Sequence, residues 1–217
     1  MKYNKNIFRM FYSLYGVTDS CALKDISLET AVEQALMGGV SMLQLREKNL
    51  SDEDYTALAN KIFYIADEYG VPLIVNDNVQ VAKAVDADGV HLGQNDMSVA
   101  EARAILGDEK IIGVTAKTIE QALQAEADGA DYIGVGAVFP SSTKPDAIGI
   151  TIDELVNIVN SVNLPVVAIG GINSDNADTL CNTGICSIAA SSAIFGSDNI
   201  KNAAERLKDI AEEVVEA

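Results

Sequence analysis

The chain has 217 residues, of which 48% are hydrophobic, and its formal net charge is -17. We expect a single domain over 1–217, with 1–11 as a short N-terminal extension. Nucleic acids and anionic membranes bind clustered Lys and Arg, so the acidic balance argues against both as partners. The odd number of cysteines, 3 in all, indicates reduced thiols in a cytoplasmic protein.

Eight short apolar runs alternate along the chain with longer stretches of helical periodicity. Runs that are apolar on both faces are typical of buried parallel strands. Eight such units predict an α/β fold, a closed (β/α)8 TIM barrel. An open doubly wound sheet is the alternative, but it normally has a Gly-rich turn after the first strand, and residues 18–21 contain no glycine. The predicted strands are Leu14–Val17, Met42–Leu45, 73–75, Gly89–Leu92, 111–114, Tyr132–Val135, Val166–Ile169 and Ser187–Ala190.

Capping residues and glycines predict where the intervening helices begin and end. Ser98 and Thr151 each precede a glutamate by three positions, and Thr118 precedes Gln121 in the same way, which is the spacing of a capping box. Ser51 and Asp54 have the same spacing but form a weaker capping-box pattern, because Asp54 stands in place of Glu or Gln. Glycine at a helix end relieves a left-handed backbone, and the expected helix ends are Gly38, Gly39, Gly70, Gly107, Gly129 and Gly184.

Polar side chains interrupt the second predicted strand at its carboxyl end. The two-residue period of a strand puts Gln44, Arg46 and Lys48 on one face. A solvated strand end is the alternative, but Gln44 and Arg46 lie in an otherwise apolar run. An anion such as a diphosphate would satisfy this cluster.

Two carboxylates follow the next two strands at the same barrel mouth. Asp77 follows the third predicted strand, and Asp96 follows the fourth. Carboxylate oxygens suit Mg²⁺, which shares its coordination with substrate phosphates. Both residues could instead cap the next helices, but the neighbouring cations favour the metal site.

The loops after the last three strands offer hydroxyls and glycines. Ser141, Ser142 and Thr143 precede Lys144 after the sixth strand, a set that suits a phosphate or a departing diphosphate, although a solvated loop is also compatible with it. Gly170 and Gly171 end the seventh strand, and Ser191 and Ser192 end the eighth. Loops at these places commonly hold phosphate in this fold, while a tight turn is the alternative for the glycines.

The only histidine, His91, lies inside the apolar fourth strand. A buried supporting role is therefore favoured over general base catalysis. Without His91 the chain cannot form a Ser-His or Cys-His nucleophile pair.

Several of these segments, in the same order and at similar spacing, resemble the thiamine phosphate synthase family. They are LYGVTD at 14–19, QLREK at 44–48, VND at 75–77, GVHLGQ at 89–94 with Asp96, PSSTK at 140–144 and AIGGI at 168–172. The chain departs from the family pattern at Thr115, where serine is expected, and at Ser141, where threonine is common. Residues 185–187 replace the usual Ala-Asp-Gly run before the eighth strand.

The resemblance implies a transferase that joins 4-amino-2-methyl-5-hydroxymethylpyrimidine diphosphate to 4-methyl-5-(2-phosphooxyethyl)thiazole, or its 2-carboxy form, with Mg²⁺ as cofactor. It implies a dissociative reaction that needs no protein nucleophile, with Arg46, Lys48, Thr115 and Lys144 as the catalytic residues. Asp77 and Asp96 would bind Mg²⁺. The pyrimidine diphosphate would be held by Gln44, Arg46, Lys48, Asn76, Thr115 and Lys144. The thiazole phosphate would be held by Ser141, Ser142, Thr143, Gly171, Ser191 and Ser192.

Three other functions remain open at this point. The related thiazole tautomerases use a histidine after the fifth strand, where this chain has Lys117, and they tend to lack Asp96. A Schiff-base aldolase would use Lys144, but a hydroxyl-rich loop does little to lower the pKa of a lysine. A catalytically silent barrel that senses a phosphorylated ligand is the third, against which the retained Asp77, Asp96 and Lys144 weigh.

Overall fold

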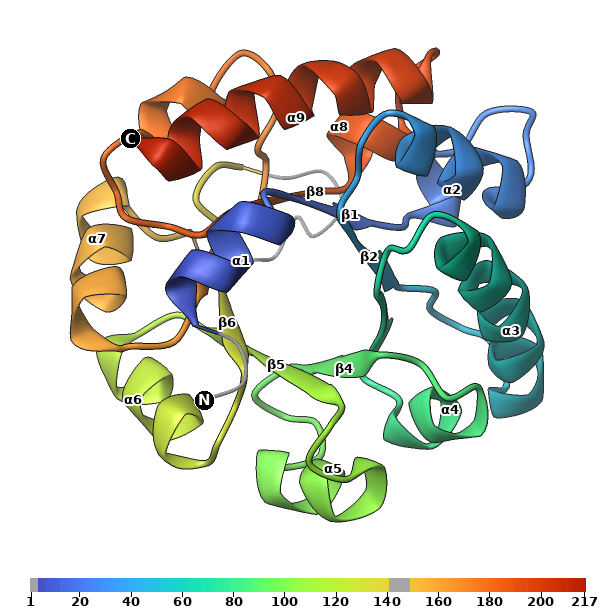
Figure 1. The fold of residues 1–217 in the computed structure, drawn as a ribbon, viewed down its shortest axis with the longest axis horizontal. Helices are drawn as coiled ribbons and strands as arrows, with labels where there is room; N and C mark the ends of the chain where they lie inside the picture. Colours follow the sequence, from blue (N-terminus) through green and yellow to red (C-terminus); the bar gives the residue numbers. More distant parts are fainter. Residues whose placement is uncertain (1–3, 141–148) are drawn as a thin grey trace.

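A computed structural model describes residues 4–140 and 149–217, in which eight parallel strands close into a barrel (Figure 1). Each strand pairs with the next one in sequence, and β8 pairs with β1. The predicted TIM barrel is therefore confirmed. The predicted strands agree with those observed, except that β3 continues to Asn76 and β5 to Ala116. The strands are β1 (Leu14–Val17), β2 (Met42–Leu45), β3 (Leu73–Asn76), β4 (Gly89–Leu92), β5 (Ile111–Ala116), β6 (Tyr132–Val135), β7 (Val166–Ile169) and β8 (Ser187–Ala190).

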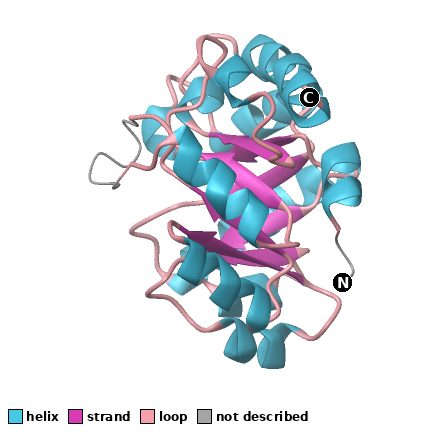
Figure 2. Ribbon diagram, turned by 90° about the vertical axis from the view of Figure 1, so that its left-hand side faces the viewer, coloured by secondary structure: helices cyan, strands magenta, loops and turns pink. Residues whose placement is uncertain are grey.

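Helices surround the strands, as the side view shows (Figure 2). In the part of the chain that the structure describes, no helix is both long and apolar enough to cross a membrane. The α-helices are α1 (Lys5–Phe11), α2 (Leu28–Met37), α3 (Asp52–Glu68), α4 (Val79–Ala84), α5 (Val99–Leu106), α6 (Ile119–Ala127), α7 (Ile152–Ser161), α8 (Ser192–Phe195) and α9 (Ile200–Glu216), and the 3₁₀ turns are η1 (Ser20–Ala22) and η2 (Ala177–Leu180).

The predicted capping residues begin their helices. Ser98 and Thr151 each form the full capping box with the glutamate three positions later. Thr118 accepts the N–H of Gln121, but the Gln121 side chain accepts from Lys117 instead of returning to the cap. The prediction that Gly184 ends a helix is wrong, because only the 3₁₀ turn η2 lies between β7 and β8 in place of an α-helix.

The N-terminal extension contains α1, which lies over the barrel opening at the amino ends of the strands (Figure 1). Phe8 is fully buried and packs with its ring against Tyr132 at the start of β6, at a centroid distance of 5.4 Å. Arg9 donates to the carbonyl oxygens of Gly184 and Ile185, and Lys5 donates to those of Val159 and Val162. The helix therefore closes the end of the barrel opposite the predicted site.

A second core fills the barrel interior, apart from the larger core between the strands and the surrounding helices. Phe8 belongs to the inner core together with Tyr15, Met42, Ile74 and Tyr132. Burial of such large side chains removes apolar surface from water and supports the rim above it.

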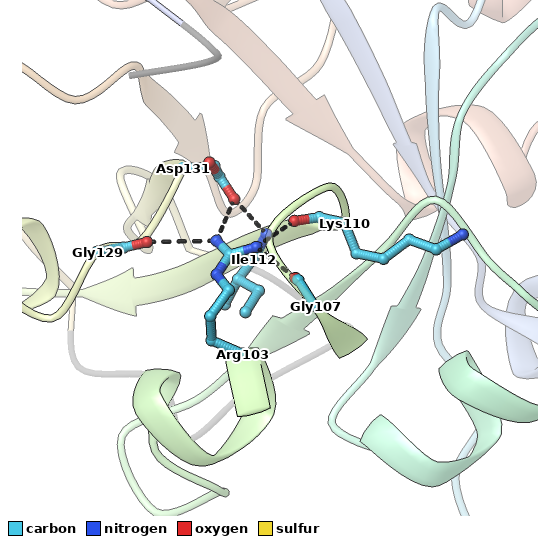
Figure 3. A network of polar contacts seen from close by, with 6 residues as sticks. All are labelled: Arg103, Gly107, Lys110, Ile112, Gly129 and Asp131. Atoms are coloured by element: carbon cyan, nitrogen blue, oxygen red, sulfur yellow. Dashed lines mark hydrogen bonds and ion pairs between the residues drawn. The ribbon is translucent and has the colours of Figure 1, made fainter. Parts of the chain in front are cut away.

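Arg103 joins three segments at the amino end of the barrel (Figure 3). Its guanidinium donates to the carbonyl oxygens of Gly107, Lys110 and Gly129, and it pairs with the Asp131 carboxylate at 2.8 Å. The same carboxylate oxygen accepts the N–H of Ile112 at 2.8 Å. Both charged side chains are largely buried, with exposed fractions of 21% and 14%. This network fixes where β5 and β6 begin.

We expect Arg103→Ala to lower the free energy of unfolding by about 2–3 kcal/mol, because Asp131 would lose its charged partner inside the protein. Chemical denaturation measures this loss. Arg206→Ala, which removes an exposed arginine from α9, is the matched control and should change stability by less than about 0.5 kcal/mol. Equal losses in the two variants would contradict a structural role for the Arg103 network.

Candidate active site

A cavity of about 160 Å³ opens at the carboxyl ends of the strands. Parallel strands in a closed barrel place these ends on one rim, so side chains that are distant in sequence meet there. Val17, Ile169 and Ile172 form apolar parts of the wall. The predicted site residues on the wall are Gln44, Arg46, Asn76, Thr115, Gly171, Ser191 and Ser192.

Thr18 holds the end of β2 beside β1. Its N–H donates to the Gln44 carbonyl, and its hydroxyl oxygen accepts the N–H of Arg46, both at 2.9 Å. The same hydroxyl donates to the Glu47 carboxylate at 2.9 Å. Glu47 is therefore bound to Thr18, while Gln44 and Arg46 line the cavity, in agreement with the predicted two-residue alternation.

Asp77 and Asp96 lie on the same rim, close enough for the Asp96 carboxylate to raise the pKa of Asp77. Neither residue caps a helix, because Asn78 caps α4 and Ser98 caps α5. Asp77 has a φ of 63°, which few non-glycine residues adopt, and its N–H donates to the His91 carbonyl at 2.9 Å. The backbone at the end of β3 thus holds this carboxylate beside Asp96.

The electrostatics of this carboxylate pair suit a divalent cation. Partial desolvation and then the adjacent Asp96 raise the pKa of Asp77 to about 6, whereas Lys48 acts in the opposite direction. Among the described residues, no third His, Cys, Asp or Glu joins the pair into a larger cluster. Two carboxylates leave coordination positions for water and phosphate oxygens, which is the arrangement that Mg²⁺ prefers.

The glycines after β7 permit a close approach between two rim segments. Gly170 and Gly171 have φ values of 103° and 64°. A Cβ on Gly170 would collide with Ala137, and one on Gly171 would collide with the carbonyl oxygens of Phe139 and Pro140. The glycine pair therefore forms more than a tight turn, because it packs against the segment that follows β6.

Ser191 carries a buried polar atom that has no hydrogen-bond partner among the described residues. Its Oγ is inaccessible to solvent and makes no hydrogen bond among the described residues, yet Ser191 lies on the cavity wall directly before α8. A buried hydroxyl without a partner is costly, so an oxygen-rich ligand would supply what the protein does not.

His91 lies largely buried in the wall of the cavity and is bonded on both sides of its ring. Nδ1 lies 2.9 Å from the Tyr132 hydroxyl, and Nε2 lies 2.9 Å from the Thr115 hydroxyl. Burial lowers the pKa of His91 to about 4, so the ring is neutral near pH 7. These contacts agree with the supporting role expected from its apolar strand.

The remaining predicted residues fall into two groups. Lys48 lies near enough to Asp77 to lower its pKa, whereas Ser141, Ser142, Thr143 and Lys144 lie outside the described residues. Lys117 also lines the cavity, although the sequence analysis considered it only as the position of a tautomerase histidine. Its place on the wall could have been predicted from the two-residue period of a strand, because Lys117 follows Thr115 on the same face.

Comparisons with known proteins point to one family. A family model described as thiamine monophosphate synthase matches residues 14–194. The chain is 51% identical over 199 residues to the thiamine-phosphate synthase of Ruminiclostridium cellulolyticum, covering 92% of this chain and 95% of that one. For the thiamine-phosphate synthase of Clostridium tetani the identity is 47% over 205 residues, with coverages of 94% and 97%. A solved structure, thiamine phosphate pyrophosphorylase from Pyrococcus furiosus, matches with a TM-score of 0.87 and 41% identity over 95% of this chain and 98% of that one.

The low pKa of His91 predicts a specific loss of stability in acid. Between the ordinary pKa of about 6.5 and the folded value of about 4, the unfolded chain binds a proton that the folded chain does not, so stability falls as the pH falls. Going from pH 7 to pH 5 should cost about 2 kcal/mol through His91. Denaturation of the wild type and of His91→Asn at both pH values measures this difference. The same pH dependence in both proteins would contradict it.

Proposed function

This chain belongs to the thiamine monophosphate synthase family. We propose that different parts of the barrel rim bind the two substrates of its reaction. It is a transferase that acts on small-molecule substrates. It joins 4-amino-2-methyl-5-hydroxymethylpyrimidine diphosphate to a thiazole phosphate and yields thiamine phosphate and pyrophosphate. Lys117 stands where the tautomerases have histidine, so that alternative is not favoured.

The diphosphate end of the first substrate belongs at the cationic side of the rim. In the proposal, Arg46 and Lys48 bind its oxygens, and Lys144 joins them from the loop after β6. Asp77 and Asp96 hold Mg²⁺, for which their adjacent carboxylates and the raised pKa of Asp77 are the support. When bound, the ion neutralises charge on the leaving diphosphate. The cations act in the same direction, because each stabilises the negative charge that develops on the departing group.

The pyrimidine ring fits the wall between β2 and β5. Gln44, Asn76 and Thr115 line this part of the cavity and supply polar groups for a nitrogen heterocycle. Gln44 has an exposed fraction of only 4%, so its amide is held firmly. Fixed polar groups orient the ring so that the bond to the diphosphate can break without further rearrangement.

The phosphate of the thiazole belongs at the loops after β7 and β8. Gly171, Ser191 and Ser192 lie there on the cavity wall, and the Ser191 hydroxyl has no partner in the part of the chain that the structure describes. The loops after β7 and β8 and a short extra helix form the usual phosphate site of this fold, and α8 is such a helix. Ser141, Ser142 and Thr143 complete the proposed site from the loop after β6.

The proposed mechanism is dissociative and needs no nucleophile from the protein. The carbon–oxygen bond to the diphosphate breaks with both electrons leaving on oxygen, and the thiazole nitrogen then attacks the pyrimidinylmethyl cation. The observation that carries this proposal is that Arg46 lines the same cavity as the glycine and serine residues after β7 and β8, with Lys48, Asp77 and Asp96 near one another on the same rim. His91 is neutral and engaged on both nitrogens, so it takes no proton from a reacting group.

We expect Asp77→Asn and Asp96→Asn to raise the Mg²⁺ concentration needed for half-maximal turnover at least tenfold, because each removes one anionic ligand. Turnover is followed as pyrophosphate release during Mg²⁺ titration at saturating substrates. Asp209→Asn, an exposed carboxylate of α9, is the matched control and should leave the titration unchanged. Wild-type activity of both rim variants at limiting Mg²⁺ would contradict the metal assignment.

A further inference from the structure

A continuous chain of side-chain hydrogen bonds crosses the inside of the barrel from β2 to β5. Gln44 Nε2 donates to the Tyr15 hydroxyl at 3.0 Å, and the Tyr15 and Tyr132 hydroxyl oxygens lie 2.8 Å apart. Tyr132 then meets His91 Nδ1 at 2.9 Å, and His91 Nε2 meets the Thr115 hydroxyl at 2.9 Å. Both ends of the chain, Gln44 and Thr115, line the cavity.

Glycines in two neighbouring strands make room for this chain. A Cβ on Gly113 of β5 would overlap the Tyr132 ring and its hydroxyl, and a Cβ on Gly134 of β6 would lie 3.1 Å from His91 Cε1. Tyr15 and Tyr132 are almost fully buried, with exposed fractions of 1% and 0%. Buried tyrosine hydroxyls need partners, and inside this barrel they find them in each other and in the two flanking residues.

The hydrogens along the chain can be assigned by counting donors and acceptors. Because Gln44 Nε2 donates to Tyr15, the Tyr15 hydrogen has only one acceptor among the described residues, the Tyr132 oxygen. The Tyr132 hydrogen then goes to His91 Nδ1. A neutral imidazole has one N–H, so His91 carries its hydrogen on Nε2 and donates it to the Thr115 oxygen.

The two ends of the chain are linked by this assignment. Gln44 Oε1 is left as an acceptor, and the Thr115 hydroxyl keeps its own hydrogen to donate. Reversing the Gln44 amide would reverse every hydrogen in the chain, including the tautomer of His91. The orientation of the Gln44 amide therefore determines whether the Thr115 hydroxyl donates to the cavity or accepts from it.

We propose that Tyr15, Tyr132 and His91 are positioning residues that fix Gln44 as an acceptor and Thr115 as a donor, and thereby select the substrate ring. This inference rests on the proposed binding of the pyrimidine by Gln44 and Thr115. A ring with an amino group and an unprotonated ring nitrogen matches this pair. A ring in which an oxo group replaces the amino group carries an N–H where the amino form has an acceptor, and it would be rejected.

The tautomer of His91 tests the chain without reference to activity. His91 is the only histidine, so ¹⁵N-histidine labelling gives the two imidazole nitrogens of a single ring. Wild type should show hydrogen on Nε2 and a bare Nδ1 at pH 7. Tyr132→Phe removes the donor to Nδ1 and should move the ¹⁵N resonance of Nδ1 toward that of an imidazole nitrogen without a hydrogen bond, while the hydrogen stays on Nε2. Hydrogen on Nδ1 in the wild type, or an unchanged Nδ1 resonance in Tyr132→Phe, would overturn the proposal.

Two further variants keep this test interpretable. Tyr12→Phe removes the hydroxyl of a tyrosine outside the chain, whose ring packs on Phe8, and should leave the Nδ1 resonance of His91 unchanged. Tyr15→Phe breaks the chain one step earlier and replaces Tyr132→Phe if that variant does not fold. In Tyr15→Phe the Tyr132 hydroxyl still donates to Nδ1 but no longer accepts from Tyr15, so the Nδ1 resonance should move in the same direction by a smaller amount, and an unchanged resonance there would count against the chain.

Steady-state kinetics separates positioning from general damage. Tyr132→Phe should raise KM for the pyrimidine diphosphate about tenfold, while KM for the thiazole phosphate should change less than twofold. The preference for the amino substrate over its oxo analogue, measured as a ratio of kcat/KM, should fall at least tenfold. An equal rise in both KM values with selectivity unchanged would overturn the selection role. If the protein lacked synthase activity, the tautomer measurement would still report on the chain.

Discussion

Closure of the parallel barrel is the constraint on which the site depends. A ring of parallel strands pairs every strand with two neighbours and brings all carboxyl ends to one rim. Pairing of β8 with β1 places the segments from both ends of the sequence side by side. Arg46 after β2 and Asn76 at the end of β3 then line one cavity together with the glycines after β7 and the serines after β8. Asp77 lies on the same rim near Lys48 and Asp96. At the other end, α1 and its buried Phe8 close the interior.

Much of the fold could be predicted from the sequence because buried parallel strands are apolar on both faces and stand out against helical periodicity. The capping residues Ser98 and Thr151 were readable for a similar reason, since they act on backbone a few residues away. The role of α1 was missed because Phe8 gains its burial from β6, far along the chain. Gly184 was misread because a glycine with φ of 78° can follow a 3₁₀ turn as well as a helix.

Charged residues of the site could be predicted from the sequence, whereas its buried uncharged residues could not. Arg46 and Asp77 are conspicuous in an apolar strand or directly after one, and the structure brings both to the rim. Tyr15 and Tyr132 gave no signal, because a tyrosine near the start of an apolar strand resembles any other core residue. Only the closed barrel brings their hydroxyls to 2.8 Å across the interior. Long-range polar contacts of this kind depend on register, which local sequence does not encode.

Together these features support the proposal that the protein stabilises a departing anion and supplies no nucleophile of its own. The most direct test replaces the methyl group of the pyrimidine diphosphate by trifluoromethyl and measures single-turnover rates with the thiazole phosphate and Mg²⁺. Electron withdrawal destabilises a pyrimidinylmethyl cation, so the account predicts a rate lower by orders of magnitude while binding is largely retained. A rate equal to or faster than that of the natural substrate would show that a nucleophile assists departure, and would contradict it.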